Sequence, residues 1–76
     1  MARAETHPIR MAIIETIRAN PAEPGWSANK LSQAVQLPLS NVAYHVACLR
    51  DAGLIVETGK ARRRGAIEHF YALSGK

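Results

Sequence analysis

The segment from Leu31 to Ile55 constrains the fold of this chain more than any other part of the sequence. It reads LSQAVQLPLSNVAYHVACLRDAGLI and predicts a helix that ends near Gln36, a turn at Pro38, and a second helix that is closed by Gly53. Proline is tolerated at this turn because the first turn of a helix has amide groups without intrahelical partners. Glycine adopts the left-handed conformation that ends many helices. Two helices joined by so short a turn cross at a steep angle.

The helix expected over about residues 39–52 has one apolar face. At 100° per residue, Val42, Val46 and Leu49 fall within about 60° of one another, so we expect them in the core. The opposite side is expected to carry Ser40, Tyr44, Ala47 and Asp51, and the flanks Asn41, Ala43 and Cys48. Apart from Asp51 these side chains are small or uncharged. His45 lies beside the apolar face, and we interpret it as a half-buried, hydrogen-bonded packing residue rather than a metal ligand.

Another helix is expected to begin near Pro8, because Thr6 or His7 can cap it and a proline in the first turn needs no amide donor. Isoleucines recur every four residues and define its core stripe: Ile9, Ile13 and Ile17. The helix should end at or before Asn20, since the proline that follows disfavours helical geometry in the residue ahead of it. Residues 21–25 then form a loop.

Ser27 is placed to cap the helix that ends near Gln36, and the inner face of that helix is expected to consist of Leu31, Ala34 and Val35. Trp26 is expected in a short strand that pairs with a later hairpin. Two stretches have strand propensity, Ile55–Thr58 and Ala66–Leu73. The glycine-bounded tip between them, residues 59–65, has no acidic residue and carries four cations: Lys60, Arg62, Arg63 and Arg64.

These elements predict a mainly α chain with a small β-hairpin (α+β), which is a winged helix-turn-helix of three helices and a β-wing. The 76 residues are expected to form one domain with its core over about residues 7–73. A hydrophobic content of 47% is typical of a globular chain. The single cysteine fits a reducing compartment, and neither a membrane-spanning run nor a signal peptide is recognised, so a cytoplasmic location is expected.

The pattern is typical of proteins that bind double-stranded DNA. In a helix-turn-helix the second helix of the pair enters the major groove, so we call residues 39–52 the recognition helix. Its polar side chains Ser40, Asn41 and Tyr44 are candidates for contacts with base edges or phosphates, and which of them reads a base stays open. Ala43 and Ala47 are small enough to allow close approach or contact with a thymine methyl group.

The cationic tip is the second candidate contact with DNA. Arginine binds phosphate bidentately or enters a narrow minor groove, while lysine acts as a point charge. This predicts a role for Lys60, Arg62, Arg63 and Arg64 on the backbone or in the minor groove. The net charge of +4 agrees with an anionic partner. Arg10, near the start of the first helix, either contacts the DNA backbone or forms an intramolecular ion pair.

Three stretches in order resemble the ArsR-like winged-helix transcriptional regulators. They are HPIRMAIIETI, WSANKLSQAVQLPLSNVAYHVACLRDAGLI and RRRGAIEHFYAL, which together cover roughly residues 7–73. The second is similar to a recognition-helix pattern near "SNVSYHVRxLxxAGLI", and the third to a wing pattern near "RGAxEHFYxL". The resemblance implies a cytoplasmic DNA-binding regulator that is usually dimeric.

The resemblance does not extend to the metal sites of that family. Its metal sensors carry a Cys-x-Cys motif in the helix that enters the helix-turn-helix, and the matching residues 29–33 contain no cysteine. The chain also ends at Lys76, before a C-terminal helix of the kind that carries metal ligands and dimer contacts in other members. His45, His69 and Cys48 lack the spacing of a zinc site. No metal and no other cofactor is therefore expected.

Met11 and Ile14 lie well away from the isoleucine stripe of the first helix, which suggests a homodimer contact there. An enzyme is not expected, because the sequence shows neither a phosphate-binding glycine loop nor a nucleophile with its base, and no small-molecule substrate is evident. Two alternatives to a regulator remain. One is a winged-helix adaptor that binds proteins, and the other is an architectural or recombination-directionality factor that bends DNA.

Overall fold

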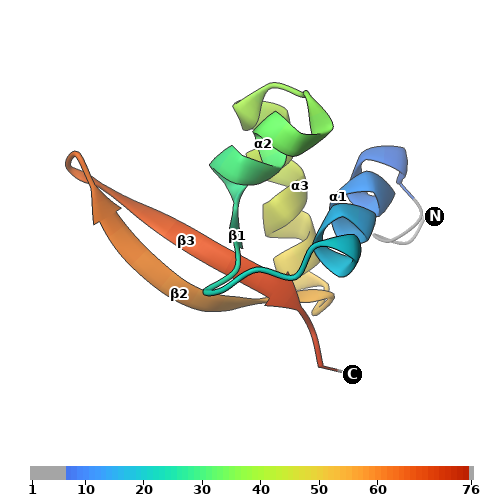
Figure 1. Ribbon diagram of the computed structural model, residues 1–76. Helices are drawn as coiled ribbons and strands as arrows, with labels where there is room; N and C mark the ends of the chain where they lie inside the picture. Colours follow the sequence, from blue (N-terminus) through green and yellow to red (C-terminus); the bar gives the residue numbers. More distant parts are fainter. Residues whose placement is uncertain (1–6, 76) are drawn as a thin grey trace.

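Three helices pack against one another beside a small antiparallel sheet, and the hairpin of that sheet extends past the helices (Figure 1). The computed structural model describes residues 7–75. The elements follow one another as α1 (Pro8–Ala19), β1 (Trp26–Ser27), α2 (Ala28–Val35), α3 (Leu39–Asp51), β2 (Ile55–Arg63) and β3 (Ala66–Leu73). The sheet order is β1-β3-β2. The predicted winged helix-turn-helix with three helices is therefore confirmed.

Side-chain caps fix the starts of α1 and α2. The amide of Ile9 donates to Nδ1 of His7 over 3.2 Å, so His7 caps α1, while Thr6 lies outside the described residues. Ser27 caps α2 as predicted, because its hydroxyl accepts from the amide of Lys30 at 3.1 Å. Each bond satisfies one amide that the first helical turn leaves without a partner.

Gly53 ends the recognition helix α3 in the way that the sequence predicts. Its φ is +80°, and its amide donates to the carbonyl of Arg50, while the amide of Leu54 donates to the carbonyl of Leu49. This pair of bonds is a Schellman motif, which satisfies two carbonyls at the helix end. The chain then turns directly into β2.

The core lies where the three helices meet the base of the sheet, and it consists of Ile13, Ile17, Leu31, Val42, Val46, Leu49, Ile55 and Tyr71. Every residue that the sequence assigned to the core face of α3 is buried there. On α2 the prediction for Ala34 was wrong, because this residue is exposed. The buried side of that short helix is centred between Leu31 and Val35, and Ala34 lies roughly 90° away from it. In the part of the chain that the structure describes, no helix has the length and apolar character to cross a membrane.

The wing is a longer hairpin than expected. Strand β2 does not end at Thr58 but continues to Arg63, and only Arg64 and Gly65 form the turn. Both turn residues have positive φ, at 48° and 83°, as a two-residue hairpin turn of the primed type requires. A bulge between Glu57 and Gly59 shifts the register, after which β2 pairs with β3 up to the turn. The basic segment is ordered because β3 offers it backbone partners along its whole length.

The predicted short strand at Trp26 is confirmed. Trp26 pairs with Tyr71, and Ser27 pairs with Phe70, so β1 ties the entrance of α2 to the central strand. The preceding Gly25 allows this close approach, since a Cβ built on it would lie 2.6 Å from the carbonyl oxygen of Tyr71. The sheet thereby fixes where α2 and α3 stand relative to the wing.

Candidate nucleic-acid interface

The outward face of α3 presents the side chains that the sequence nominated. Ser40, Asn41, Ala43 and Tyr44 are exposed, with Tyr44 at 62% of its full accessibility, and Ala47 is half-buried. They occupy the N-terminal two-thirds of the helix, where helix-turn-helix proteins contact bases. This surface carries hydroxyl and amide groups and no charge.

The opposite face of α3 fixes the orientation of that surface. Val42, Val46 and Leu49 are buried in the core, and His45 beside them is only 8% exposed. Rotation of the helix about its axis would bring these apolar side chains into water at roughly 1.5 to 3 kcal/mol each. The polar face therefore stays directed outward.

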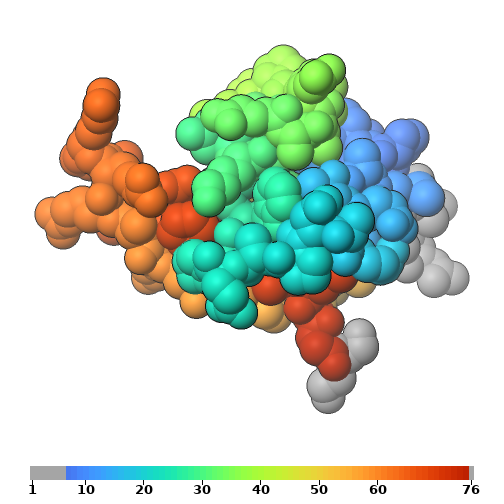
Figure 2. Space-filling view, in the orientation of Figure 1, coloured from blue at the N-terminus to red at the C-terminus, as the bar shows by residue number. Residues whose placement is uncertain are grey.

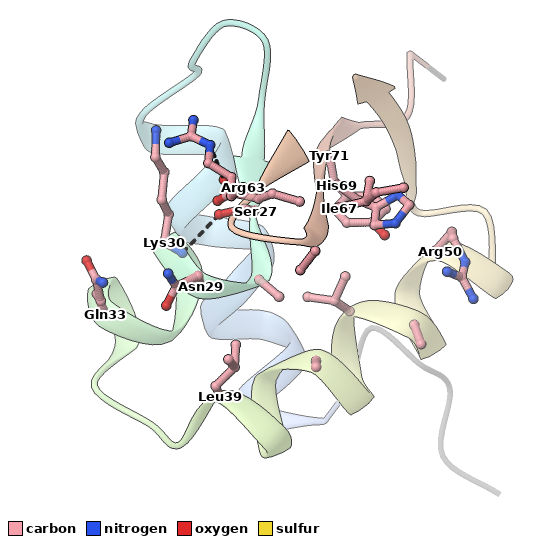
Figure 3. A pocket seen from close by; sticks show the side chains of 16 residues that line it. Ser27, Asn29, Lys30, Gln33, Leu39, Arg50, Arg63, Ile67, His69 and Tyr71 are labelled. Atoms are coloured by element: carbon pink, nitrogen blue, oxygen red, sulfur yellow. Dashed lines mark hydrogen bonds and ion pairs between the residues drawn. The ribbon is translucent and has the colours of Figure 1, made fainter. Parts of the chain in front are cut away.

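A groove of 750 Å³ separates the two helices of the helix-turn-helix from the wing (Figure 3). Of the nominated recognition residues, Ala43 and Ala47 line it, whereas Ser40, Asn41 and Tyr44 lie outside it. The floor is largely apolar, with Ala28, Val46 and Tyr71 among its residues, and polar side chains of α2 such as Asn29 and Gln33 stand at its edge.

Cations from three elements surround this groove. Lys30 comes from α2, Arg50 from α3 and Arg63 from the end of β2 (Figure 3). Arg50 also donates to Oδ1 of Asp51 at 3.2 Å, and that hydrogen bond, together with the nearby Tyr71, raises the pKa of Arg50 further above its ordinary value. The guanidinium is thus charged at neutral pH.

Sequence reasoning nominated only Arg63 of these three groups. Arg50 lies on the same helical stripe as Leu39 and Ala43, so the 100° spacing could have placed it beside the wing. Nothing in the local sequence indicates the position of Lys30, because it depends on how α2 packs against the sheet.

The four wing cations do not share one environment. Nε of Arg63 lies 3.2 Å from Oε1 of Glu68, and Nζ of Lys60 lies 3.9 Å from Oε2 of Glu57. Within residues 7–75, Arg62 and Arg64 form no ion pair. Both acids lie outside residues 59–65, which contain no acidic residue, and they reach the tip through strand pairing and the bulge. The wing projects from the molecular surface as a separate arm (Figure 2).

Glu57 also approaches the third histidine of the chain. Nδ1 of His69 lies 3.3 Å from Oε2 of Glu57, without the angle of a hydrogen bond, and the His69 ring lines the groove. His69 therefore belongs to the wing wall of the groove, whereas Glu57 lies outside the residues that line it.

The remaining nominated residues lie on α1. Nε of Arg10 donates to Nδ1 of His45 at 3.0 Å, which is an intramolecular contact, although a hydrogen bond to a neutral ring rather than an ion pair. Met11 is 51% exposed and Ile14 is half-buried against the core. Both line a second groove, of 520 Å³, together with Leu54 and Leu73.

Among residues 7–75 no three histidine, cysteine, aspartate or glutamate side chains lie close enough together to hold a metal ion. Cys48 is a half-buried free thiol on the flank of α3.

A family model described as "Helix-turn-helix domain" matches residues 6–58, which is more than half of the chain. The chain belongs to the helix-turn-helix domain family. The match runs from the start of α1 through α2 and α3 into β2. It therefore contains the recognition helix α3 and the two helices that pack against it, α1 and α2.

This helix-turn-helix chain is also similar to a solved structure described as "Crystal structure of the predicted DNA-binding transcriptional regulator from E. coli". The two share 29% sequence identity with a TM-score of 0.71, and the match covers 96% of this chain and 68% of that chain. The likeness therefore extends beyond the family match and includes the wing. No curated protein matches the chain.

Proposed function

We propose that this protein is a small transcriptional regulator that binds double-stranded DNA with sequence preference. Recognition helix α3 enters the major groove, and the wing contacts the backbone or the minor groove. The observation that carries this proposal is the polar, uncharged face of α3 beside a groove surrounded by Lys30, Arg50 and Arg63. Helix-turn-helix family membership and the likeness to a DNA-binding regulator support it. The protein acts as one non-enzymatic domain of the ArsR-like branch, in the cytoplasm.

The outward face of α3 and the cations around the groove have different roles in this proposal. On α3, Ser40, Asn41 and Tyr44 supply the donors and acceptors that distinguish base pairs in the major groove. Ala43 and Ala47 let the helix approach closely. The DNA strand that flanks this groove then passes between the helices and the wing, where its phosphates meet the cations of the groove without regard to sequence.

Selection of bound sites from a random duplex pool, repeated at several protein concentrations, tests the proposal. We expect an enriched motif, and binding that weakens steeply as salt rises, because each phosphate contact adds about −0.9 to the slope of log K against log salt. A pool that remains random would exclude a sequence-specific regulator. Absence of retention on any duplex, even at low salt, would exclude DNA as the partner altogether.

A protein-binding adaptor is the second candidate, and one observation favours it. Leu39 and Ile67 are 48% and 55% exposed, and both line the largely apolar groove. Exposed apolar side chains around a groove are typical of interaction surfaces. An adaptor predicts that Lys30→Ala and Arg50→Ala leave heparin and duplex retention unchanged, whereas the regulator predicts that both variants reduce it.

The proposed regulator forms a homodimer through α1. Met11 and Ile14 give the outer side of this helix an apolar surface, and the second groove continues it to Leu54 and Leu73. A two-fold axis across the helix would place two recognition helices for half-sites about one helical turn apart.

Sedimentation at micromolar concentration tests the dimer. We expect the wild type to sediment as a dimer and Met11→Glu and Ile14→Glu as folded monomers that prefer single half-sites. Ala12→Glu is the matched control, because it adds the same charge to an exposed position of α1 outside the groove. A wild type that sediments as a folded monomer would contradict the dimer.

A further inference from the structure

The inner side of the recognition helix holds a polar contact that the DNA-binding scheme does not use. Nε of Arg10, on α1, donates a 3.0 Å hydrogen bond to Nδ1 of His45, on α3. The ring of His7 lies 4.5 Å from the ring of His45, centre to centre, and the ring of Tyr44 meets it edge-on at 5.1 Å. The bond links residues 35 positions apart in the sequence, and it joins the first helix to the middle of the recognition helix.

This hydrogen bond requires a neutral His45. A guanidinium can only donate, so Nδ1 must offer a lone pair and the proton of the neutral ring must sit on Nε2. A proton on Nδ1 would remove the acceptor and bring an imidazolium against the guanidinium in a site that is 8% exposed. Both effects separate Arg10 from His45.

The surroundings of His45 contain no compensating charge. Burial lowers the pKa of His45 below its ordinary value of 6.5, and the nearby His7 and Arg10 lower it further. Two groups face His45 from the first helix and its cap: the cation Arg10 on α1 and the imidazole of His7. On α3 the neighbouring titratable group is Tyr44. From α2 and the sheet, no ionisable side chain of residues 7–75 forms a hydrogen bond or ion pair with it.

We propose that His45 is a proton-sensitive positioning residue, which holds the recognition helix in its DNA-reading orientation while it is neutral and releases Arg10 when it is protonated. The proposal rests on the proposed function. Next to His45, Tyr44 is a candidate for base contacts, and Arg10, once released, can contact phosphate. Acidification should therefore lower the preference for a selected site more than it lowers binding to random duplex.

The direction of the stability change follows from linkage. A histidine with an ordinary pKa in the unfolded chain takes up its proton near pH 6.5, whereas the folded chain takes it up at lower pH because the pKa of His45 is lowered. The unfolded state therefore binds more protons in this interval, and the stability that is present above pH 6.5 decreases as the pH falls toward the folded pKa.

His7 uses the same kind of acceptor at the start of α1. Its Nδ1 accepts from the amide of Ile9 at 3.2 Å. The two histidines thus use the same nitrogen as an acceptor, one to begin α1 and one to bind Arg10 to α3.

The first experiment needs no DNA. NMR titration of the imidazole resonances from pH 4.5 to 8 is expected to show that His45 titrates below pH 6.5 in the wild type. In Arg10→Met, His45 should titrate at higher pH than in the wild type, because this substitution keeps an aliphatic side chain but removes the positive charge. The unfolding free energy should fall as the pH decreases below 6.5 in the wild type, and it should fall less in His45→Gln. An unchanged His45 titration in Arg10→Met would overturn the proposal.

The second experiment measures affinity for a selected site and for random duplex from pH 7.5 to 5.5 at fixed ionic strength. The ratio should fall about three- to tenfold in the wild type, the equivalent of one net hydrogen bond. It should stay constant in His45→Gln, whose amide oxygen accepts from Arg10 at every pH. In Arg10→Met it should be low at every pH, because no hydrogen bond is left for protonation of His45 to break.

His69→Gln is the control for charge added by another histidine, and it should keep the wild-type fall in the ratio whatever it does to affinity. A constant wild-type ratio would overturn the proposal, as would His45→Gln and Arg10→Met profiles like that of the wild type. Absence of binding to any duplex, with the expected NMR result, would instead contradict the proposed function and leave the proton-sensitive contact between α1 and α3 in place.

Discussion

The recognition helix and the wing face the same proposed ligand, yet they are built in opposite ways. α3 buries one whole face, including Val42 and Leu49, and the N-terminal two-thirds of the helix expose uncharged polar groups on the other face. The outer half of the wing, residues 60–67, has no buried residue and exposes charged groups. A rigid helix can hold donors and acceptors in the geometry that base reading requires, whereas a charged arm needs only to reach a phosphate. The difference assigns specificity to α3 and salt-dependent affinity to the wing.

The two regions should also differ in local stability. Phe70 and Tyr71 anchor the base of the wing, but beyond them it depends on strand pairing and on surface ion pairs such as Arg63 with Glu68. Exposed ion pairs contribute roughly 0–1 kcal/mol each, so they do not replace a core. The wing tip is expected to open at much lower free energy than α3.

The largest expected effect therefore comes from the buried side of α3. Leu49→Ala should lower the free energy of unfolding by about 2–5 kcal/mol, because it removes a fully buried side chain and leaves a cavity. Ile67→Ala on the exposed wing should change it by about 0.5 kcal/mol or less. Urea denaturation of both variants checks the contrast. Equal losses would mean that the wing is part of the cooperative core and would remove the basis of the comparison.

The fold could be predicted largely because its signals are local. Helical spacing identified the core face of α3. Ser27 marked the start of α2 through its hydroxyl, and Gly53 marked the end of α3 through its left-handed backbone conformation. Trp26 indicated the short strand before α2. Each of these follows from residues within one or two helical turns of one another. Such signals survive without knowledge of the tertiary structure.

The features that sequence reasoning missed depend on distant partners. The basic segment of β2 was expected as a loop, because only pairing with β3 makes it a strand. Lys30 was not nominated, since its place beside the groove depends on how α2 packs, and Glu68 was not recognised as the partner of Arg63. For the candidate site, the outward face of α3 could be predicted from the sequence, whereas the charged groups that surround it could not.

A smaller effect, confined to DNA binding, should sharpen the specificity side of the comparison. Asn41→Ala or Tyr44→Ala is expected to cost roughly 1–3 kcal/mol on a selected site and much less on random duplex, because both side chains are exposed and contribute no core packing. Fluorescence anisotropy with the two duplexes measures the difference. A uniform loss on both would reassign these residues to backbone contacts and erase the functional distinction between α3 and the wing.

The smallest effect per residue is expected on the wing, where it should appear in the salt dependence. Replacing Arg62, Arg63 and Arg64 together by Ala should flatten the slope of log K against log salt by roughly one to three units and weaken binding to all sequences alike. Arg62 and Arg64 should supply most of this change, because Glu68 already neutralises Arg63.

Glu68→Gln tests that division within the wing directly. It removes the charge that Arg63 now faces at 3.2 Å while keeping the size of the side chain, so Arg63 becomes available to phosphate. The slope should steepen by up to about 0.9, the value of one phosphate contact. Affinity for selected and random duplex should rise by the same factor, since a phosphate contact carries no sequence information. A gain on the selected site alone would show that the wing reads sequence, and the contrast between a reading helix and a charged arm would no longer hold.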